Sequence, residues 1–88
     1  MWTIKFTKNA EKDKKLIKNA GLEEKTKKLL NVMAKNPFQN PPKYEKLVGD
    51  LNGYYSRRIN LQHRLVYRVI NESNTIVVHS MWSHYGDN

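Results

Sequence analysis

Residues 53–70 read GYYSRRINLQHRLVYRVI, and this stretch predicts two antiparallel strands joined by a short loop. Its two halves are rich in β-branched and aromatic side chains, which favour strands. The predicted strands cover residues 54–59 and 64–70. A three-residue loop centred on Leu61 would close a symmetric hairpin. In that register Arg58 lies directly opposite Arg64.

Two further strands are expected, one before and one after this hairpin. Residues 2–6 alternate apolar and polar side chains, as a strand with one buried face does. Residues 75–84 are again rich in β-branched and aromatic side chains, and the polar residues 71–74 form the turn before them. The last three strands therefore form an antiparallel meander.

Two amphipathic helices are predicted between the first strand and the hairpin. The first covers residues 10–20, with Thr7 or Asn9 in position to cap it. Gly21 ends it, and the second helix covers residues 22–35. The sequence therefore predicts an α+β fold in which a two-helix hairpin packs on one face of a small antiparallel sheet.

The composition excludes several classes of protein. The 88 residues suffice for a single domain, residues 1–88, and contain no cysteine, which excludes disulfide frameworks and thiolate metal sites. No apolar run approaches the roughly 18 residues of a membrane span. Charged residues also begin too early for a signal peptide. We therefore expect a cytoplasmic protein.

The net charge of +8 predicts an anionic partner, with nucleic acid favoured over an acidic protein or a membrane surface. Residues 1–36 hold ten lysines and no arginine against four acids. All four arginines lie within twelve residues, and we expect them to be exposed together: Arg57, Arg58, Arg64 and Arg68. Arginine grips phosphate in two places, so this group is the sharper candidate for recognition.

The opposed arginines Arg58 and Arg64 predict an anion site. Like charges directly opposite each other weaken a sheet, so an anion held between them would explain the pair. The alternative is that both side chains simply point to solvent. Alternation puts Leu65 and Tyr67 on the core face and Arg64 on the face away from the helices. The returning last strand brings His84 within a residue or two of Arg64.

The histidines make a poor metal site. His79 and His84 are five positions apart, which puts them on opposite faces of a regular strand, and no acidic cluster lies nearby in the sequence. We therefore expect no metal and no cofactor. His63, beside the hairpin loop, fits a structural role.

Glu45 lies in an irregular, basic segment, residues 37–53, where a short strand is possible. A carboxylate among lysines stays ionised and could accept a proton, or it could be a plain surface residue. His84 is likewise either a proton donor or an ordinary strand-end residue. With the paired arginines, these groups suit cleavage of RNA by its own 2′-hydroxyl, which needs a base, an acid and fixed positive charge but no metal. Four aromatic residues could stack on bases or simply pack: Tyr54, Tyr55, Trp82 and Tyr85.

Several motifs resemble those of the YoeB/Txe family of bacterial type II toxins, within the RelE superfamily. They lie in order along nearly the whole chain: Asn36-Pro37-Phe38, Glu45-Lys46-Leu47, Asp50-Leu51-Asn52-Gly53-Tyr54-Tyr55-Ser56-Arg57-Arg58-Ile59, Gln62-His63-Arg64-Leu65-Val66-Tyr67-Arg68-Val69 and His84-Tyr85. The resemblance implies a RelE-like fold. It also implies a ribosome-dependent endonuclease that cuts messenger RNA in the A site and inhibits translation.

The resemblance also implies roles for single residues. By motif position Glu45 is the general base and His84 the general acid, Arg58 and Arg64 stabilise the transition state, and Tyr85 lies beside the acid. Further RNA or phosphate contacts are expected from four residues: Lys46, Tyr55, Arg57 and Arg68. The implied partners are messenger, ribosomal RNA and a YefM-type antitoxin, in a homodimer or a toxin–antitoxin hetero-oligomer.

The chain departs from the family pattern at two places. Val48 occupies the usual position of an active-site lysine, whose charge Lys46 could partly replace, and residues 86–88 follow the His-Tyr pair at which relatives commonly end. The alternative function is therefore a catalytically weak or inactive RNA- or ribosome-binding module of the same fold, also neutralised by an antitoxin.

Overall fold

The computed structural model describes residues 1–84, with side chains through Ser83. Its elements follow in the order β1 (Thr3–Phe6), α1 (Lys8–Asn19), α2 (Glu23–Lys35), β2 (Tyr44–Lys46), β3 (Tyr55–Arg58), β4 (His63–Ile70) and β5 (Thr75–His84). Single 3-10 turns cover Gly49–Leu51 and Asn71–Ser73. The predicted order of helices and strands is confirmed.

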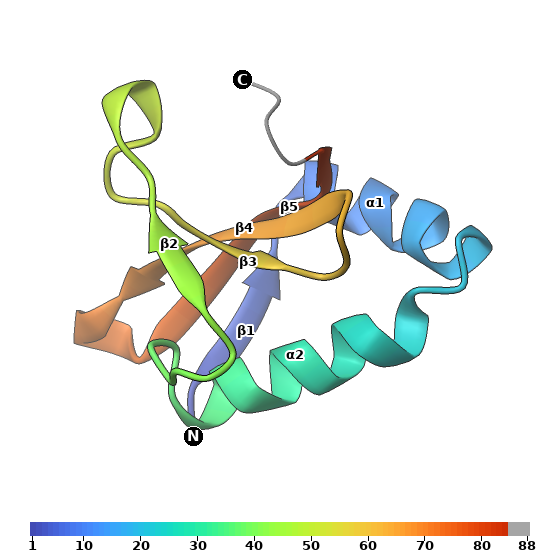
Figure 1. Cartoon of the computed structure of the whole chain (residues 1–88). Coiled ribbons are helices and arrows are strands. Elements are labelled where there is room, and N and C mark those ends of the chain that lie inside the picture. Colours follow the sequence, from blue (N-terminus) through green and yellow to red (C-terminus); the bar gives the residue numbers. More distant parts are fainter. Residues whose placement is uncertain (85–88) are drawn as a thin grey trace.

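The five strands form one sheet in the order β1-β5-β4-β3-β2, and both helices cover the same face of it (Figure 1). The predicted α+β architecture is therefore confirmed. The four strands from β2 to β5 pair antiparallel, whereas β1 pairs parallel to β5 at one edge. The sheet is thus mostly antiparallel, because the helical hairpin carries the chain from the first strand to the far edge.

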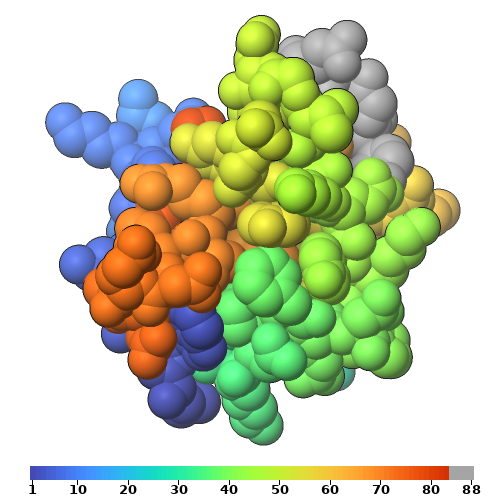
Figure 2. All heavy atoms as spheres, turned by 90° about the vertical axis from the view of Figure 1, so that its left-hand side faces the viewer, coloured from blue at the N-terminus to red at the C-terminus, as the bar shows by residue number. Residues whose placement is uncertain are grey.

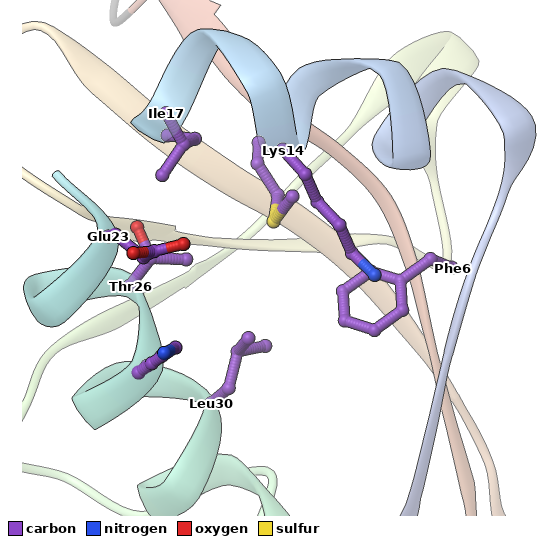
Figure 3. A pocket seen from close by; sticks show the side chains of 8 residues that line it. Phe6, Lys14, Ile17, Glu23, Thr26 and Leu30 are labelled. Carbon is purple, nitrogen blue, oxygen red and sulfur yellow. The ribbon is translucent and has the colours of Figure 1, made fainter. Parts of the chain in front are cut away.

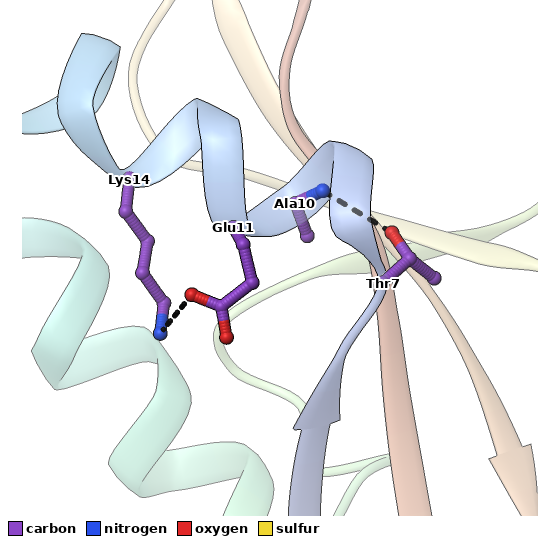
Figure 4. Close-up of polar contacts among 4 residues, drawn as sticks. All are labelled: Thr7, Ala10, Glu11 and Lys14. Atoms are coloured by element: carbon purple, nitrogen blue, oxygen red, sulfur yellow. Dashed lines mark hydrogen bonds and ion pairs between the residues drawn. The ribbon is translucent and has the colours of Figure 1, made fainter.

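Helix α1 begins where Thr7 provides a cap. The Thr7 hydroxyl oxygen accepts a hydrogen bond from the amide of Ala10 at 3.1 Å, which satisfies one of the orphan amides of the first turn (Figure 4). An ion pair between Glu11 and Lys14, 3.0 Å long, bridges neighbouring positions on the exposed side of the helix. Gly21 follows α1 with a φ of +73°, a conformation that suits glycine.

The core lies between the helices and the sheet. Ile17, Leu29 and Met33 from the helices pack on Leu65 and Val78 from the central strands, and all five are buried. Each such side chain stabilises the fold by roughly 1.5–3 kcal/mol relative to exposure. This apolar layer fixes which face of the sheet is covered and leaves the opposite face for other side chains.

The hairpin between β3 and β4 has the predicted register. Arg58 pairs directly with Arg64, and Leu65 and Tyr67 lie in the core. The side-chain oxygen of Asn60 accepts hydrogen bonds from the amides of Gln62 and His63 at 2.9 and 2.7 Å, which closes the loop. The symmetric hairpin expected from the sequence is therefore confirmed.

Strand β5 is not regular. Its ten residues face the eight of β4, and the pairing shifts twice. Tyr67 pairs with Val78, Val66 with Ser80, and Arg64 with Ser83, so β5 holds two extra residues in bulges. β5 is therefore not regular between His79 and His84, so the expected alternation of their side chains does not follow from their spacing alone.

Of the helices in residues 1–84, neither is long and apolar enough to cross a membrane.

Candidate active site

The face of the sheet that turns away from the helices carries two rows of side chains from neighbouring strands. The rows follow from the cross-strand register and the alternation of side chains along each strand. One row consists of Glu45, Ser56, Val66 and Ser80, and the row beside it of Arg58, Arg64 and Ser83. We call this surface the open face. It brings a carboxylate and two guanidinium groups together on adjacent strands.

A pocket of about 300 Å³ lies at the β2 end of the open face. It is lined by Pro42, Lys43, Glu45, Ser56 and Arg58. Ser56 is buried, Glu45 is half-buried and Arg58 is exposed, so the pocket has a small, deep floor and a charged rim. The carboxylate and the guanidinium of the pocket come from β2 and β3, which pair Glu45 with Ser56.

Ser83 extends the open face onto β5. Ser83 pairs with Arg64, and the next residue, His84, pairs with His63. The prediction that His84 lies within a residue or two of Arg64 along the sheet is confirmed for the backbone. The side chain of His84 and all of Tyr85 lie outside the described residues.

Arg57 is not part of the open face. It is 1% exposed, and its guanidinium donates hydrogen bonds to the backbone carbonyls of Pro37, Gln39 and Pro42. The expectation that Arg57 is an exposed phosphate-binding residue is therefore wrong. Three prolines without amide hydrogens make this segment rich in unpaired carbonyls, and Arg57 satisfies three of them.

The signal that places Arg57 was present in the sequence. The hairpin symmetric about Leu61 sets Arg57 opposite Leu65, which belongs to the core face. Tyr67, also on that face, donates its hydroxyl to the carbonyl of Pro37 at 2.9 Å. Burial raises the pKa of the Tyr67 hydroxyl above its ordinary value of 10.0, and the nearby Arg57 charge partly opposes this rise.

The contacts of Arg57 and Tyr67 tie the irregular segment to the sheet. Figure 2 shows residues from the middle of the chain, green to yellow, lying against residues near position 70, orange. The segment that leads into β2 and Glu45 is thus held by buried hydrogen bonds rather than by regular secondary structure.

Tyr55 and Lys46 lie on the face opposite Glu45. They pair with each other across β2 and β3, and Tyr55 pairs with buried Tyr67. The Tyr55 ring packs in a cluster with the rings of Phe38, Tyr44 and Tyr67, at centroid distances of 5.0 to 6.0 Å. The expected RNA contacts of Tyr55 and Lys46 are thus not brought together with Glu45.

Two other residues that the sequence singled out, Arg68 and Val48, have exposed side chains. Arg68 lies on the open face, four residues along β4 from Arg64, which is about 13 Å in a strand. Val48 is 81% exposed in the segment after β2. The valine leaves this position uncharged.

The described histidines have structural contacts. His63 is buried, and its ring stacks on Trp82 with centroids 3.9 Å apart. His79 contacts the edge of the Tyr54 ring at 5.2 Å. Trp82 and Tyr54, which were considered as base-stacking residues, therefore already pack against protein rings.

The whole chain was compared with known proteins. A family model described as "YoeB-like toxin of bacterial type II toxin-antitoxin system" matches residues 4–85. The chain belongs to the YoeB toxin family. It is therefore a toxin of the type II toxin–antitoxin class.

Individual YoeB proteins are similar over most of their length. A Toxin YoeB from Synechocystis is 40% identical over 67 residues, which is 76% of this chain and 71% of the relative. A solved YoeB/ParE toxin from Agrobacterium tumefaciens has a TM-score of 0.84 at 33% identity, covering 94% of this chain and 99% of that one. A YoeB chain in a heterotetrameric YoeB–YefM complex from Staphylococcus aureus has a TM-score of 0.79 at 38% identity, covering 97% and 99%.

A second pocket of this YoeB-family chain lies on the helical side of the sheet, apart from Glu45 (Figure 3). It measures about 290 Å³ and is lined by apolar side chains, among them Phe6 and Leu30, and by four polar ones: Lys14, Glu23, Thr26 and Lys27. The amine of Lys14 lies 4.0 Å from the centre of the Phe6 ring at its rim. It contains none of the residues expected for catalysis.

Ser56 was missed by reasoning from the YoeB motifs, although it lines the pocket of the open face. Its buried position opposite Glu45 follows from alternation, because Ser56 precedes buried Arg57 on the other face. Among residues 1–83 the side chains of His, Asp and Glu form no group of three that could hold a metal ion.

Proposed function

We propose that this toxin is an endoribonuclease that cleaves messenger RNA in the ribosomal A site and so inhibits translation in the cytoplasm. The observation that carries the proposal is the open face, where Glu45, Arg58 and Arg64 occupy adjacent strands. The motif resemblance implies the roles of base and transition-state stabilisers for the same residues. The reaction uses no metal and no other cofactor.

The spacing of the strands suits a single phosphodiester. Neighbouring strands lie about 4.8 Å apart, and Arg64 lies two residues along β4 from Val66, which is in register with Glu45, so the backbones of Glu45 and Arg64 are separated by about 12 Å. Arg58 lies on the strand between them. A phosphate bound in this interval meets a carboxylate on one side and two guanidinium groups on the other.

The chemistry follows from these positions. The Glu45 carboxylate takes the proton of the ribose 2′-hydroxyl, and the 2′-oxygen attacks the adjacent phosphorus. Arg58 and Arg64 stabilise the charge that grows on the phosphate oxygens. The bond to the 5′-oxygen breaks, and His84 donates a proton to this leaving group. The products are a 2′,3′-cyclic phosphate and a free 5′-hydroxyl.

Single-turnover cleavage on programmed ribosomes tests the proposal. Arg64→Ala should lower the rate constant on the order of 10²–10³-fold, because it removes one donor to the transition state. Glu45→Ala and His84→Ala should lower it by roughly 10²–10⁴-fold each. Ribosome affinity and the fold should be retained in all three variants.

His79→Ala is the matched control for His84→Ala, since it removes a different imidazole from the same strand. It should cost some stability, because the Tyr54 ring loses its packing partner, and leave the cleavage rate near that of the wild type. Equal damage from both substitutions would contradict the assignment of His84 as the acid. A wild-type protein that binds ribosomes without cutting would instead establish the binding-module alternative.

We also infer that a YefM-type antitoxin holds the toxin inactive. The support is the S. aureus relative, which was solved as a heterotetrameric YoeB–YefM complex. The +8 charge of the chain favours an acidic segment in such a partner. The assembly is expected to be a toxin–antitoxin hetero-oligomer, with a toxin homodimer as the other state.

A further inference from the structure

The bulged part of β5 has one edge that no strand covers. β1 pairs with β5 only from Thr75 to Val78, and β5 continues for six more residues. Backbone groups on this uncovered edge require other hydrogen-bond partners, because buried unpaired groups are costly.

The backbone of β5 turns irregularly where β1 ends. The carbonyl of Val78 accepts a hydrogen bond from the amide of Thr7 at 3.1 Å, and the next carbonyl, of His79, accepts one from the Thr7 hydroxyl at 2.8 Å. In a regular strand successive carbonyls point to opposite edges. Both carbonyls here point toward the start of α1, which is a direct sign of the bulge.

The buried carboxylate of Asp13 completes the contact with this edge. Asp13 is 7% exposed and accepts a hydrogen bond from the amide of Met81 at 2.9 Å in the interior. Thr7 and Asp13 lie six residues apart at the N-terminal cap and in the middle of α1. Helix α1 and its cap therefore hold the bulged segment at His79 through Thr7 and at Met81 through Asp13, and the side-chain amide of Asn9 donates a longer hydrogen bond, of 3.5 Å, to the same His79 carbonyl.

We propose that Asp13, with Thr7, is a positioning residue that sets the register at which the end of β5 meets Arg64. The inference rests on the proposed function, because its catalytic consequence depends on His84 as the acid. Two residues after Met81, Ser83 pairs with Arg64, and His84 follows. Releasing the Met81 amide frees β5 to lose a bulge, and each such loss shifts Ser83 and His84 by one residue along β4.

The register of β5 is measured first, on the free protein by NMR. In the wild type, cross-strand nuclear Overhauser effects should connect Arg64 with Ser83 and Val66 with Ser80. Asp13→Ala should weaken or move these signals and speed the exchange of the Met81 amide by about tenfold or more. Asp13→Asn keeps an acceptor oxygen and should preserve both signals.

Cleavage is measured next, in single turnovers on programmed ribosomes. Asp13→Ala should lower the maximal rate constant by about 10²-fold or more, since a misplacement of about 1 Å can have that cost and a shift of one residue moves His84 by about 3.4 Å. The ribosome concentration at half-maximal rate should not change. Asp13→Asn should recover most of the rate, and Thr7→Val should lose rate where Thr7→Ser retains it.

Two control variants separate positioning from loss of charge or stability. Glu11→Gln on the exposed side of α1 removes the same single charge as Asp13→Asn. Ile17→Val reduces core packing in the same helix and removes no hydrogen bond, because the isoleucine side chain has no polar atom. Both should cleave like the wild type with an unchanged pairing of β4 and β5.

The possible outcomes separate a failure of this inference from a failure of the proposed endoribonuclease function. A wild-type protein that does not cleave defeats the proposed function, and the NMR measurements still decide whether Asp13 sets the register. If Asp13→Ala keeps the pairing of Arg64 with Ser83, the inference is wrong. The inference is equally wrong if Asp13→Ala loses the register of β4 and β5 but cleaves at the rate of the wild type. If Asp13→Ala fails to fold, the register of β5 and the cleavage rate are measured instead on Thr7→Val, with Thr7→Ser as its control.

Discussion

Adjacent arginines in this toxin have opposite environments. Arg57 is buried on three carbonyls of the proline-containing segment, whereas Arg58 is exposed beside Glu45. The strand alternation alone separates them. One guanidinium therefore stabilises the approach to β2, and its neighbour lies at the rim of the pocket on the open face.

Replacing Arg57 should reduce stability far more than replacing Arg58. Arg57→Met leaves three carbonyls without their donor and should lower the free energy of unfolding on the order of 3 kcal/mol or more. Arg58→Met, the matched control, should change it by less than about 1 kcal/mol. Urea denaturation measures both. Equal stabilities would show that the Arg57 hydrogen bonds contribute little to the fold.

At the scale of the secondary-structure elements, the sequence was sufficient where residue pattern determines structure locally. Thr7, Gly21 and the step at Asn36 mark the helix ends, and the loop centred on Leu61 determines the pairing of Arg58 with Arg64. The bulges of β5 could not be predicted, because no local pattern marks them. They depend on Thr7 and Asp13, which lie about 70 positions earlier in the chain.

Helix α1 carries lysines of two kinds, and only one kind should contribute to binding ribosomal RNA. Lys12, Lys15 and Lys18 are exposed, whereas Lys14 is engaged by Glu11 and the Phe6 ring. Replacing the first three with Gln should weaken ribosome binding. The slope of log affinity against log salt should fall by about 0.7–0.9 for each phosphate that the variant no longer neutralises.

Lys14→Gln is the control for these substitutions and should change that slope least. Salt titrations of ribosome affinity measure all the variants. Superimposable titrations for the triple variant and the wild type would remove α1 from the ribosome-binding surface.

At the scale of the whole molecule, positive charge is divided between two sides. The ten lysines of residues 1–36 belong to β1 and the helical hairpin, whereas Arg58, Arg64 and Arg68 lie on the open face of the sheet. The sheet separates the arginines from the nine lysines of the helical hairpin, whereas Lys5 pairs with Val77, the partner of Arg68, and so lies on the same face as the arginines. A partner that covers one side can therefore leave the other available.

An antitoxin that covers the open face should stop cleavage while RNA binding persists. The purified toxin–antitoxin complex should show no cleavage on programmed ribosomes, yet retain weak, salt-dependent affinity for RNA through the lysines. Co-purification with the product of the neighbouring gene followed by both assays measures this. A complex that cuts at the rate of the free toxin would show that the open face is not covered.

The parallel pairing of β1 with β5 makes the first and last strands neighbours, with Thr3 opposite Thr75. Pairings so distant in sequence form late in folding, because a long loop must close first. A fragment ending before residue 75 would keep all of the lysines and all of the arginines, yet would leave β1 unpaired and one edge of β4 open. A chain that ends early should therefore aggregate through the unpaired edge of β4 and should not be a partly active toxin.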